Sequence, residues 1–386
     1  MRHKAAYILA LLALAVICIR SGALADSRGT QSGPPPIPPV LSVISMGAVT
    51  QNPVILGRDG TFSTLVDGRS LWTFGDTSMS IKNKNGSNWD DNSMAAATNL
   101  DASHGITLNK NYEPGSPAPI EFLPYTSAEA KYNAAHNADH CTAKSCGAEF
   151  AMWGGPVLWD AAGKRLLLFY DEIWRISGQS NWKTVGTGIA VGIEGGGITR
   201  PVENPGSKTP NLMWSADDVA YGCGSVIVGD MLYSYGCVLD FVVMNYQLAR
   251  VPLAQALDKS KWSYYAGGET WSNDPADAVS VFQGGAAGSS VFYNSFLGEY
   301  MAIYSQPLSD DIYFRVAYAP EGPWSEQSLI FTGQAGWNGD TDYAGLAHPE
   351  FAQHNGAVQY VTYAHTTGLL QQDLPLTQVV FGRPAP

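Results

Sequence analysis

The sequence of 386 residues is poor in basic side chains, with 22 lysines and arginines against 34 aspartates and glutamates, and its formal charge is −12 at pH 7. A surface with this excess of negative charge repels nucleic acid and anionic lipid. We therefore expect neither nucleic acid nor, once the leader described below is removed, a membrane as a partner. A neutral polymer such as a polysaccharide is compatible with the charge, and we expect a monomer.

Long apolar runs are also scarce. The run over residues 5–19 follows the basic Arg2 and Lys4, but it is shorter than the roughly 20 residues that span a bilayer. Small residues at Ala23 and Ala25 then form a cleavage pattern. We interpret residues 1–25 as a signal peptide, which predicts a protein that is secreted, periplasmic or held at the cell surface.

Cysteine is rare, with five residues in the chain. The four outside the leader form an even set, as is usual in exported proteins with disulfides. Cys223 and Cys237 flank a hairpin signal at residues 228–231, and Cys141 and Cys146 would close a small loop. We predict these two disulfides, with buried free thiols as the alternative. No CxxC motif or histidine cluster accompanies them, so we expect no zinc site.

Helical patterns are scarce as well, with one candidate helix at residues 127–138 and a single turn at residues 253–256. Residues 34–39 read Pro-Pro-Pro-Ile-Pro-Pro, which forms a stiff extended segment. We therefore expect a proline-rich tether over residues 26–39 and one catalytic domain over residues 40–386.

The domain repeats one pattern: an apolar strand, a turn with Gly, Asn or Asp, and a second apolar strand rich in aromatics. Such turns between apolar strands indicate β-hairpins. Five copies predict an all-β, five-bladed β-propeller, with a multi-sheet sandwich or a β-helix as the alternative. The five pairs of strands are residues 62–65 and 70–75, 156–159 and 165–171, 224–228 and 231–236, 289–293 and 300–305, and 349–353 and 357–364.

Acidic residues lie where several of these strands begin or end. Asp59 precedes the first strand, Asp76 follows its partner, and Asp171 ends the matching strand of the second copy. Burying an unpaired carboxylate is costly. Each of these side chains must therefore be paired with another protein group, exposed to solvent or required for binding or catalysis. Capping of a turn is the simpler reading of Asp59 and Asp76, and a salt bridge at the end of the strand is the simpler reading of Asp171. Two carboxylates over one pocket are, however, what hydrolysis of a glycosidic bond requires.

Other chemistries lack their motifs. The sequence contains no Gly-x-Ser-x-Gly elbow, no Walker loop and no His-Glu-x-x-His helix. We therefore expect no cofactor and no catalytic metal. Residues 338–342 alternate oxygen ligands in a way that could hold a structural calcium ion, with a plain solvated loop as the alternative.

A family resemblance rests on five segments: Gly57-Arg58-Asp59-Gly60, Trp72-Thr73-Phe74-Gly75-Asp76-Thr77, residues 298–305, residues 317–324 and His348-Pro349-Glu350. Over most of residues 45–380 the chain resembles glycoside hydrolase family 183, the bacterial endo-D-arabinanases, a family formerly labelled a domain of unknown function. The resemblance implies a propeller that cleaves α-D-arabinofuranosyl linkages inside the D-arabinan of arabinogalactan and lipoarabinomannan. Asp59 and Asp76 would then be the catalytic pair.

Substrate binding is expected from four residues near these positions: Arg58, Asp171, His348 and Glu350. Three other functions stay open. The protein could hydrolyse another furanoside such as L-arabinan, because a shared propeller does not determine the sugar. It could also be a carbohydrate-binding propeller without activity, or a structural surface protein that uses the tether as a spacer.

Overall fold

The computed structural model describes residues 33–385, apart from residues 110–112, 140, 142–144, 177–181, 194–196, 241–242 and 286. The expected signal peptide and the first part of the expected tether lie outside the described residues. Residues 34–386 form one compact unit. Its first strand, β1 (Val40–Ala48), begins directly after the proline-rich run.

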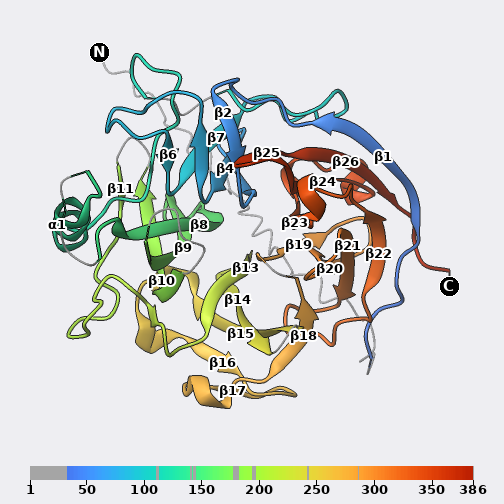
Figure 1. The fold of residues 1–386 in the computed structure, drawn as a ribbon. Coiled ribbons are helices and arrows are strands. Elements are labelled where there is room, and N and C mark those ends of the chain that lie inside the picture. Colours follow the sequence, from blue (N-terminus) through green and yellow to red (C-terminus); the bar gives the residue numbers. More distant parts are fainter. Residues whose placement is uncertain are drawn as a thin grey trace, which may run out of the picture. The chain divides into compact units, whose positions relative to one another are not determined.

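The strands form five antiparallel groups, numbered I to V along the chain (Figure 1). Group I consists of two three-stranded sheets, and each other group is one sheet of four to six strands. Group I comprises β2 (Ile55–Arg58), β3 (Phe62–Val66), β4 (Arg69–Phe74), β5 (Thr77–Met79), β6 (Trp89–Asp90) and β7 (Ser93–Ala97). Group II comprises β8 (Ala148–Asp160), β9 (Arg165–Ile176), β10 (Trp182–Ile193), β11 (Ile198–Thr199) and β12 (Trp214–Ser215).

The remaining groups follow the same antiparallel plan. Group III comprises β13 (Ala220–Val228), β14 (Met231–Asp240), β15 (Val243–Pro252), β16 (Ser263–Tyr265), β17 (Trp271–Ser272) and β18 (Ser280–Gly284). Group IV comprises β19 (Ser290–Asn294), β20 (Glu299–Ser305), β21 (Asp311–Ala317) and β22 (Ser328–Thr332). Group V comprises β23 (Tyr343–Ala347), β24 (Val358–Gly368), β25 (Gln371–Asp373), β26 (Pro375–Phe381) and the N-terminal β1.

Strands β1 and β26 pair in antiparallel register, so group V joins the first strand of the compact unit to its last one. Figure 1 shows the two strands side by side along the edge of the molecule. Because the first and last strands share one sheet, the two ends of the described chain hold each other in place.

Hydrophobic clusters fill the spaces between neighbouring groups in cyclic order. The last group packs on the first, so the ring of groups is closed. Full burial of each Leu or Phe side chain stabilises such a core by about 1.5–3 kcal/mol. Representative pairs that share a cluster are Leu71 with Leu168 (I and II), Phe169 with Leu232 (II and III), Tyr235 with Tyr304 (III and IV), Phe314 with Val379 (IV and V), and Trp72 with Tyr360 (V and I).

Middle strands are buried on both faces. All seven residues of β20, Glu-Tyr-Met-Ala-Ile-Tyr-Ser, are buried, because each face of the sheet packs against a neighbouring group. This explains why the sequence of such strands is continuously apolar and aromatic rather than alternating.

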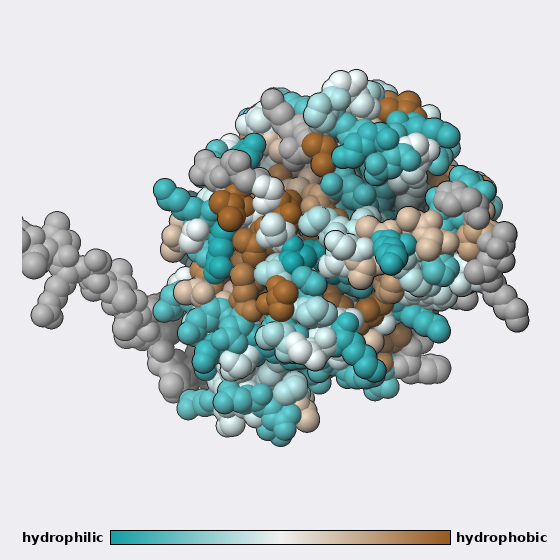
Figure 2. All heavy atoms as spheres, turned by 90° about the vertical axis from the view of Figure 1, so that its left-hand side faces the viewer, coloured by the Kyte–Doolittle hydropathy of each residue, from teal (hydrophilic) through white to brown (hydrophobic). Residues whose placement is uncertain are grey.

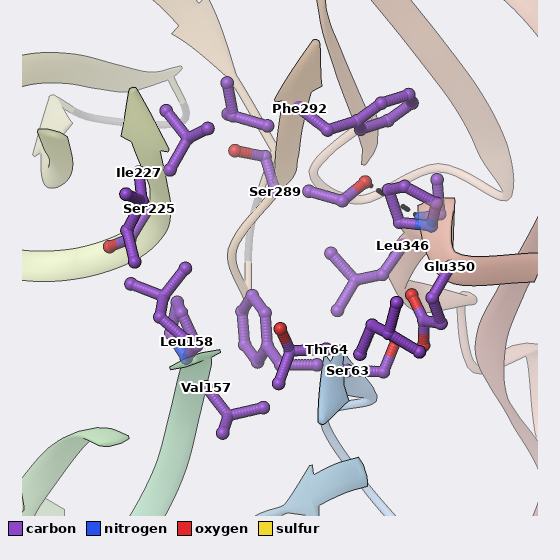
Figure 3. A pocket seen from close by; sticks show the side chains of 18 residues that line it. Ser63, Thr64, Val157, Leu158, Ser225, Ile227, Ser289, Phe292, Leu346 and Glu350 are labelled. Carbon is purple, nitrogen blue, oxygen red and sulfur yellow. Dashed lines mark hydrogen bonds between the residues drawn. The ribbon is translucent and has the colours of Figure 1, made fainter. Parts of the chain in front are cut away.

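The strand at one end of each group, namely β3, β8, β13, β19 and β23, contributes to the lining of one common cavity of about 330 Å³, called here the axis cavity. Apolar side chains such as Val157, Ile227 and Phe292 make up most of its wall, and Ser63 and Glu350 lie together on one side (Figure 3). Small residues allow the strands to approach: a Cβ on Gly224 would lie 2.8 Å from the backbone oxygen of Ser289.

The first four predicted hairpins are present as β3 and β4, β8 and β9, β13 and β14, and β19 and β20. The fifth prediction was wrong in its first strand. Pro349–Phe351 forms a 3-10 helix, and β24 pairs instead with the earlier strand β23. Pro349 has no N–H to donate to a ladder, and His354 and Asn355 both adopt positive φ, so the chain turns twice between the two strands.

Helices are few, as expected. The predicted helix is α1 (Ser127–His136), which begins with a capping box between Thr126 and Glu129. Both predicted disulfides are present, joining Cys141 to Cys146 and Cys223 to Cys237. The short 3-10 helices are η1 (Leu253–Gln255), η2 (Lys259–Lys261), η3 (Pro275–Asp277), η4 (Trp337–Gly339), η5 (Pro349–Phe351) and η6 (His354–Gly356).

The side of the molecule that carries α1 and group II shows a mainly hydrophilic surface in which hydrophobic residues gather in separate patches (Figure 2). Within the described residues no helix has both the length and the apolar character needed to cross a membrane. The two disulfides are typical of proteins that fold in an oxidising compartment outside the cytosol.

Candidate active site

Asp59 and Asp76 lie on two chain segments that are joined by backbone hydrogen bonds. Asp59 connects β2 to β3, and Asp76 connects β4 to β5. The backbone N–H of Asp59 donates to the carbonyl of Asp76 at 3.2 Å, and the N–H of Gly75 donates to the carbonyl of Asp59 at 2.8 Å. The structure therefore brings together the two residues that the sequence analysis selected as a catalytic pair.

Glycines make this close approach possible. A Cβ on Gly75 would lie only 2.6 Å from Oδ1 of Asp59, and a Cβ on Gly57 would lie 2.9 Å from the backbone nitrogen of Gln372. Gly60 has φ of +66°, a conformation that other residues rarely adopt. These contacts explain physically why both motifs place glycine beside aspartate.

The two carboxyl groups line a cleft of about 220 Å³ between groups I and V, called here the acidic cleft. Besides the two aspartates, its wall consists of polar residues, glycines, one leucine and one indole ring. These residues are Gly57, Ser78, Trp89, Asp340, Thr366, Gly368, Leu370, Gln371 and Gln372. Hydroxyl, amide and carboxylate groups of this kind can bind the hydroxyl groups of a sugar.

Arg175, on β9 of group II, forms an ion pair with Asp76. Its Nη1 lies 2.8 Å from Oδ2 and 3.0 Å from Oδ1 of Asp76, and its Nε donates to Glu149 at 2.8 Å. Its Nη2 also pairs with Asp91. The indole Nε1 of Trp89 donates to Oδ1 of Asp76 at 3.1 Å. Arg175 thus forms ion pairs with three carboxylates, and Asp76 is held in place by both Arg175 and Trp89.

These surroundings affect the two acids unequally. Burial and the charge of Asp76 together raise the pKa of Asp59 to about 8, although the charge of Arg175 opposes the rise. Burial also raises the pKa of Asp76, although the charge and hydrogen bonds of Arg175 and the hydrogen bond from Trp89 oppose that rise. Two neighbouring carboxyls in unlike surroundings are able to divide the roles of acid and base.

Asp171 lies on the face of group II that carries Arg175, because positions 171 and 175 of one strand point to the same side. It is exposed, but the surrounding protein removes part of its hydration and raises its pKa to about 6. Glu172 points to the other face and pairs with Arg200, which also binds Glu129 of α1. Of these two acids, only Asp171 faces the side of the acidic cleft.

Arg58 lies outside the lining of the acidic cleft. Its side chain is 1% exposed, its guanidinium carbon lies 4.5 Å from the centre of the Phe74 ring, and its Nη1 donates to Gln51 at 3.2 Å. This placement suits a residue that supports the strand before Asp59, and contact with a substrate in the cleft would require a rearrangement.

Neither His348 nor Glu350 lines the acidic cleft: Glu350 lines the axis cavity, and His348 is buried behind its wall, in contact with the lining residue Ser63. His348 is fully buried, its Nδ1 and Nε2 are each 2.7 Å from the hydroxyls of Ser63 and Thr362, and it stacks on Trp72. Burial lowers its pKa to about 3, so it is neutral. Burial raises the pKa of Glu350, which accepts a hydrogen bond from Ser70. The structure therefore does not bring these two residues together with the aspartate pair.

The loop considered for calcium directs its acids to different partners. Asp340 lines the acidic cleft and accepts a hydrogen bond from Thr366 at 2.7 Å, whereas Asp342 is buried and lies 2.8 Å from Nδ1 of His365. In the described part of the chain, no three His, Cys, Asp or Glu side chains cluster as metal ligands would. A structural calcium ion at this loop stays a prediction.

Sequence reasoning missed Arg175 and Asp91, and it considered Asp340 only as a possible ligand of calcium. Arg175 meets Asp76 across 99 positions of the chain, and no local pattern encodes such a contact. A signal was nevertheless present, because charged residues at 171 and 175 interrupt an otherwise apolar strand on one face. A charged side chain in such a strand needs a partner.

The fold is similar to solved structures of low sequence identity. A presumed hydrolase from Bacteroides ovatus ATCC 8483 is 15% identical, with a TM-score of 0.56 and 86% of each chain covered. A family 117 glycoside hydrolase from Zobellia galactanivorans is 10% identical, with a TM-score of 0.50, and the match covers 88% of this chain and 90% of that one. At such identities the likeness establishes the all-β fold alone.

Sequence comparison identifies the family. Among curated proteins, none has significant similarity to this sequence. Residues 50–367 match the family described as Domain of unknown function (DUF4185), and this range contains Asp59, Asp76 and Arg175. The match spans more than half of the chain, which therefore belongs to the DUF4185 family.

Proposed function

We propose that this protein is a secreted endo-acting glycoside hydrolase that cleaves α-D-arabinofuranosyl linkages within D-arabinan. The observation that carries the hydrolase is the pair Asp59 and Asp76 in one cleft, with unequal surroundings. The sugar rests on the resemblance to glycoside hydrolase family 183. The closed ring of five strand groups supports a five-bladed propeller, and it shares its fold with a family 117 glycoside hydrolase.

In the proposed mechanism, Asp59 is the proton donor. It retains its proton at neutral pH and transfers it to the glycosidic oxygen as the bond from the anomeric carbon to this oxygen breaks. Asp76, whose charged form Arg175 stabilises, has two possible roles. It either attacks the anomeric carbon to form a glycosyl ester, which water then hydrolyses with Asp59 as the base, or removes a proton from the water that attacks this carbon. Every step uses carboxyl groups of the chain itself.

Substrate binding is assigned by position. Asp171 and the cleft residues Asp340, Gln371 and Gln372 are placed to bind sugar hydroxyls. Arg58, His348 and Glu350, which were expected to bind substrate, are instead proposed to stabilise the strands next to the site, because their side chains contact protein groups.

The experiment that tests this proposal is incubation of the purified protein with mycobacterial arabinogalactan, with plant L-arabinan as the parallel substrate and Asp76→Asn as the inactive control. We expect oligosaccharides from the first substrate alone, detected by chromatography. Release from L-arabinan alone would support the second candidate, a hydrolase of another furanoside. Binding of glycan without release of products would identify a carbohydrate-binding module and contradict the proposed activity.

A further inference from the structure

Trp182, at the start of β10, presents much of its indole ring to solvent. Its side chain is 51% exposed, and the other strongly exposed apolar residue of this strand, Ile193, stands at the opposite end. An exposed indole offers a large, rigid apolar face together with one polar N–H group, which suits a ligand that is apolar on one side and hydrated on the other.

The strand register places this ring beside the catalytic groups. Trp182 lies directly opposite Arg175 on the neighbouring strand, and opposed residues point to the same face with their Cβ atoms about 4.5–5.5 Å apart. Arg175 in turn reaches Asp76 at 2.8 Å. Trp182 thus lies next to the arginine that binds Asp76, on the side of group II.

A second indole fixes the orientation of Trp182. Trp153, on β8, contacts it edge to face, with ring centres 5.0 Å apart and planes at 75°, an arrangement that aromatic pairs prefer. Trp153 lies directly opposite Asp171 on β9, so it points to the face of group II that carries Arg175. Together with Trp89 in the acidic cleft, aromatic rings extend from the aspartate pair outward to Trp182.

We propose that Trp182 is a stacking platform that binds a sugar residue of the glycan beyond the residues held at the aspartate pair. The C–H face of a sugar ring is flat and apolar, so it can lie on an exposed indole while its hydroxyls stay hydrated. A neutral chain is compatible with the acidic surroundings, which would repel an anionic partner. The inference rests on the proposed hydrolase function and adds that the substrate extends across group II.

The kinetic test compares long and short substrates. Trp182→Ala is expected to raise KM for polymeric arabinogalactan about three- to tenfold, in line with the worth of one aromatic contact, and to leave kcat nearly unchanged. KM for the shortest oligosaccharide that is still cleaved should not change, and Trp182→Phe should restore most of the affinity. Tyr293→Ala is the matched control, because Tyr293 is 52% exposed and also contacts a second ring, Tyr300, but lies in group IV.

A binding measurement separates this inference from the proposed function. In native gels that contain arabinogalactan, the wild-type protein and Tyr293→Ala should be retarded, and Trp182→Ala should be retarded clearly less. Equal retardation of all three proteins, together with normal hydrolysis, would overturn the platform and leave the hydrolase intact. If wild-type protein neither binds nor cleaves this glycan, both proposals are wrong for D-arabinan.

Discussion

The acidic cleft and the axis cavity each contain a carboxyl group whose pKa is raised by burial, yet they differ in what surrounds that group. In the cleft, Asp59 has a second carboxylate and a cation as neighbours. In the axis cavity, Glu350 is surrounded by apolar side chains and hydroxyl groups. The comparison teaches that a raised pKa alone does not identify a catalytic acid. A second charge within reach is what allows two groups to exchange protons with a substrate.

The largest expected effect on activity comes from replacing the carboxyl groups of the acidic cleft, with the carboxyl group of the axis cavity as the comparison. Asp59→Asn and Asp76→Asn should each lower kcat/KM on arabinogalactan about 10²–10⁴-fold, since each removes a proton donor or acceptor. Glu350→Gln should keep activity close to that of the wild type. Circular dichroism should show that all three variants are folded. Loss of activity in Glu350→Gln alone would place the reaction at the axis cavity.

The pH dependence of activity should follow the protonation of Asp59 in the acidic cleft. Asp59 has to carry its proton, so kcat/KM should decline about tenfold per unit above pH 8, the region of its pKa. The fold holds this proton up to about pH 8, whereas the unfolded chain releases it near 3.8. The free energy of unfolding contributed by Asp59 therefore falls as pH rises between these values, and Asp59→Asn should remove that slope in urea titrations. Constant activity up to pH 10 would contradict the assignment of Asp59 as the acid.

Replacing a glycine beside each cavity by alanine should have a smaller effect, and this effect should differ between the acidic cleft and the axis cavity. A Cβ at Gly75 meets the movable Oδ1 of Asp59, so Gly75→Ala should lower activity about tenfold by displacing the acid, with little loss of stability. A Cβ at Gly224, beside the axis cavity, meets the fixed backbone of Ser289. Gly224→Ala should therefore cost about 1–3 kcal/mol of unfolding free energy. Thermal unfolding and initial rates, measured on both variants, would separate the two effects.

The smallest effect on activity is expected at His348. Its neutral ring donates to or accepts from two hydroxyls, so His348→Gln should lower the free energy of unfolding by about 1–3 kcal/mol without changing kcat. Because the fold lowers the pKa of His348 to about 3, the stability it contributes is complete above pH 6.5 and falls as pH decreases toward 3. A change in kcat without a change in stability would assign His348 to the reaction.

Much of the fold could be predicted from local patterns. Four hairpins, the helix α1 and both disulfides follow from turn residues, a capping box and cysteine spacing, all of which act within a few positions of the chain. The fifth hairpin was misplaced because the segment Pro349–Phe351 looks apolar in sequence while its proline excludes it from a ladder. The partner β23 lies on the other side of this proline.

The site was predictable only in part. Asp59 and Asp76 stand out in sequence because Asp59 precedes a predicted strand, Asp76 follows its partner strand, and each adjoins a glycine. His348 and Glu350 share the same kind of position at a strand end, yet Glu350 lines a different cavity and His348 is buried behind the wall of that cavity. Local patterns indicate that a polar side chain ends a strand, but they do not tell which side of the sheet, or which cavity, receives it.

The sequence by itself determined the all-β class, the excess of negative charge, the disulfide pairs and the two Asp-Gly corners, because these depend on composition and on residues close in the chain. Only the tertiary structure decided that Arg175 binds Asp76 and that Trp182 stands beside this ion pair. Trp182 reaches this place through the register of β9 and β10 within group II. The contact of Arg175 with Asp76 depends on packing between groups I and II across 99 positions of the chain, and no local segment contains that information.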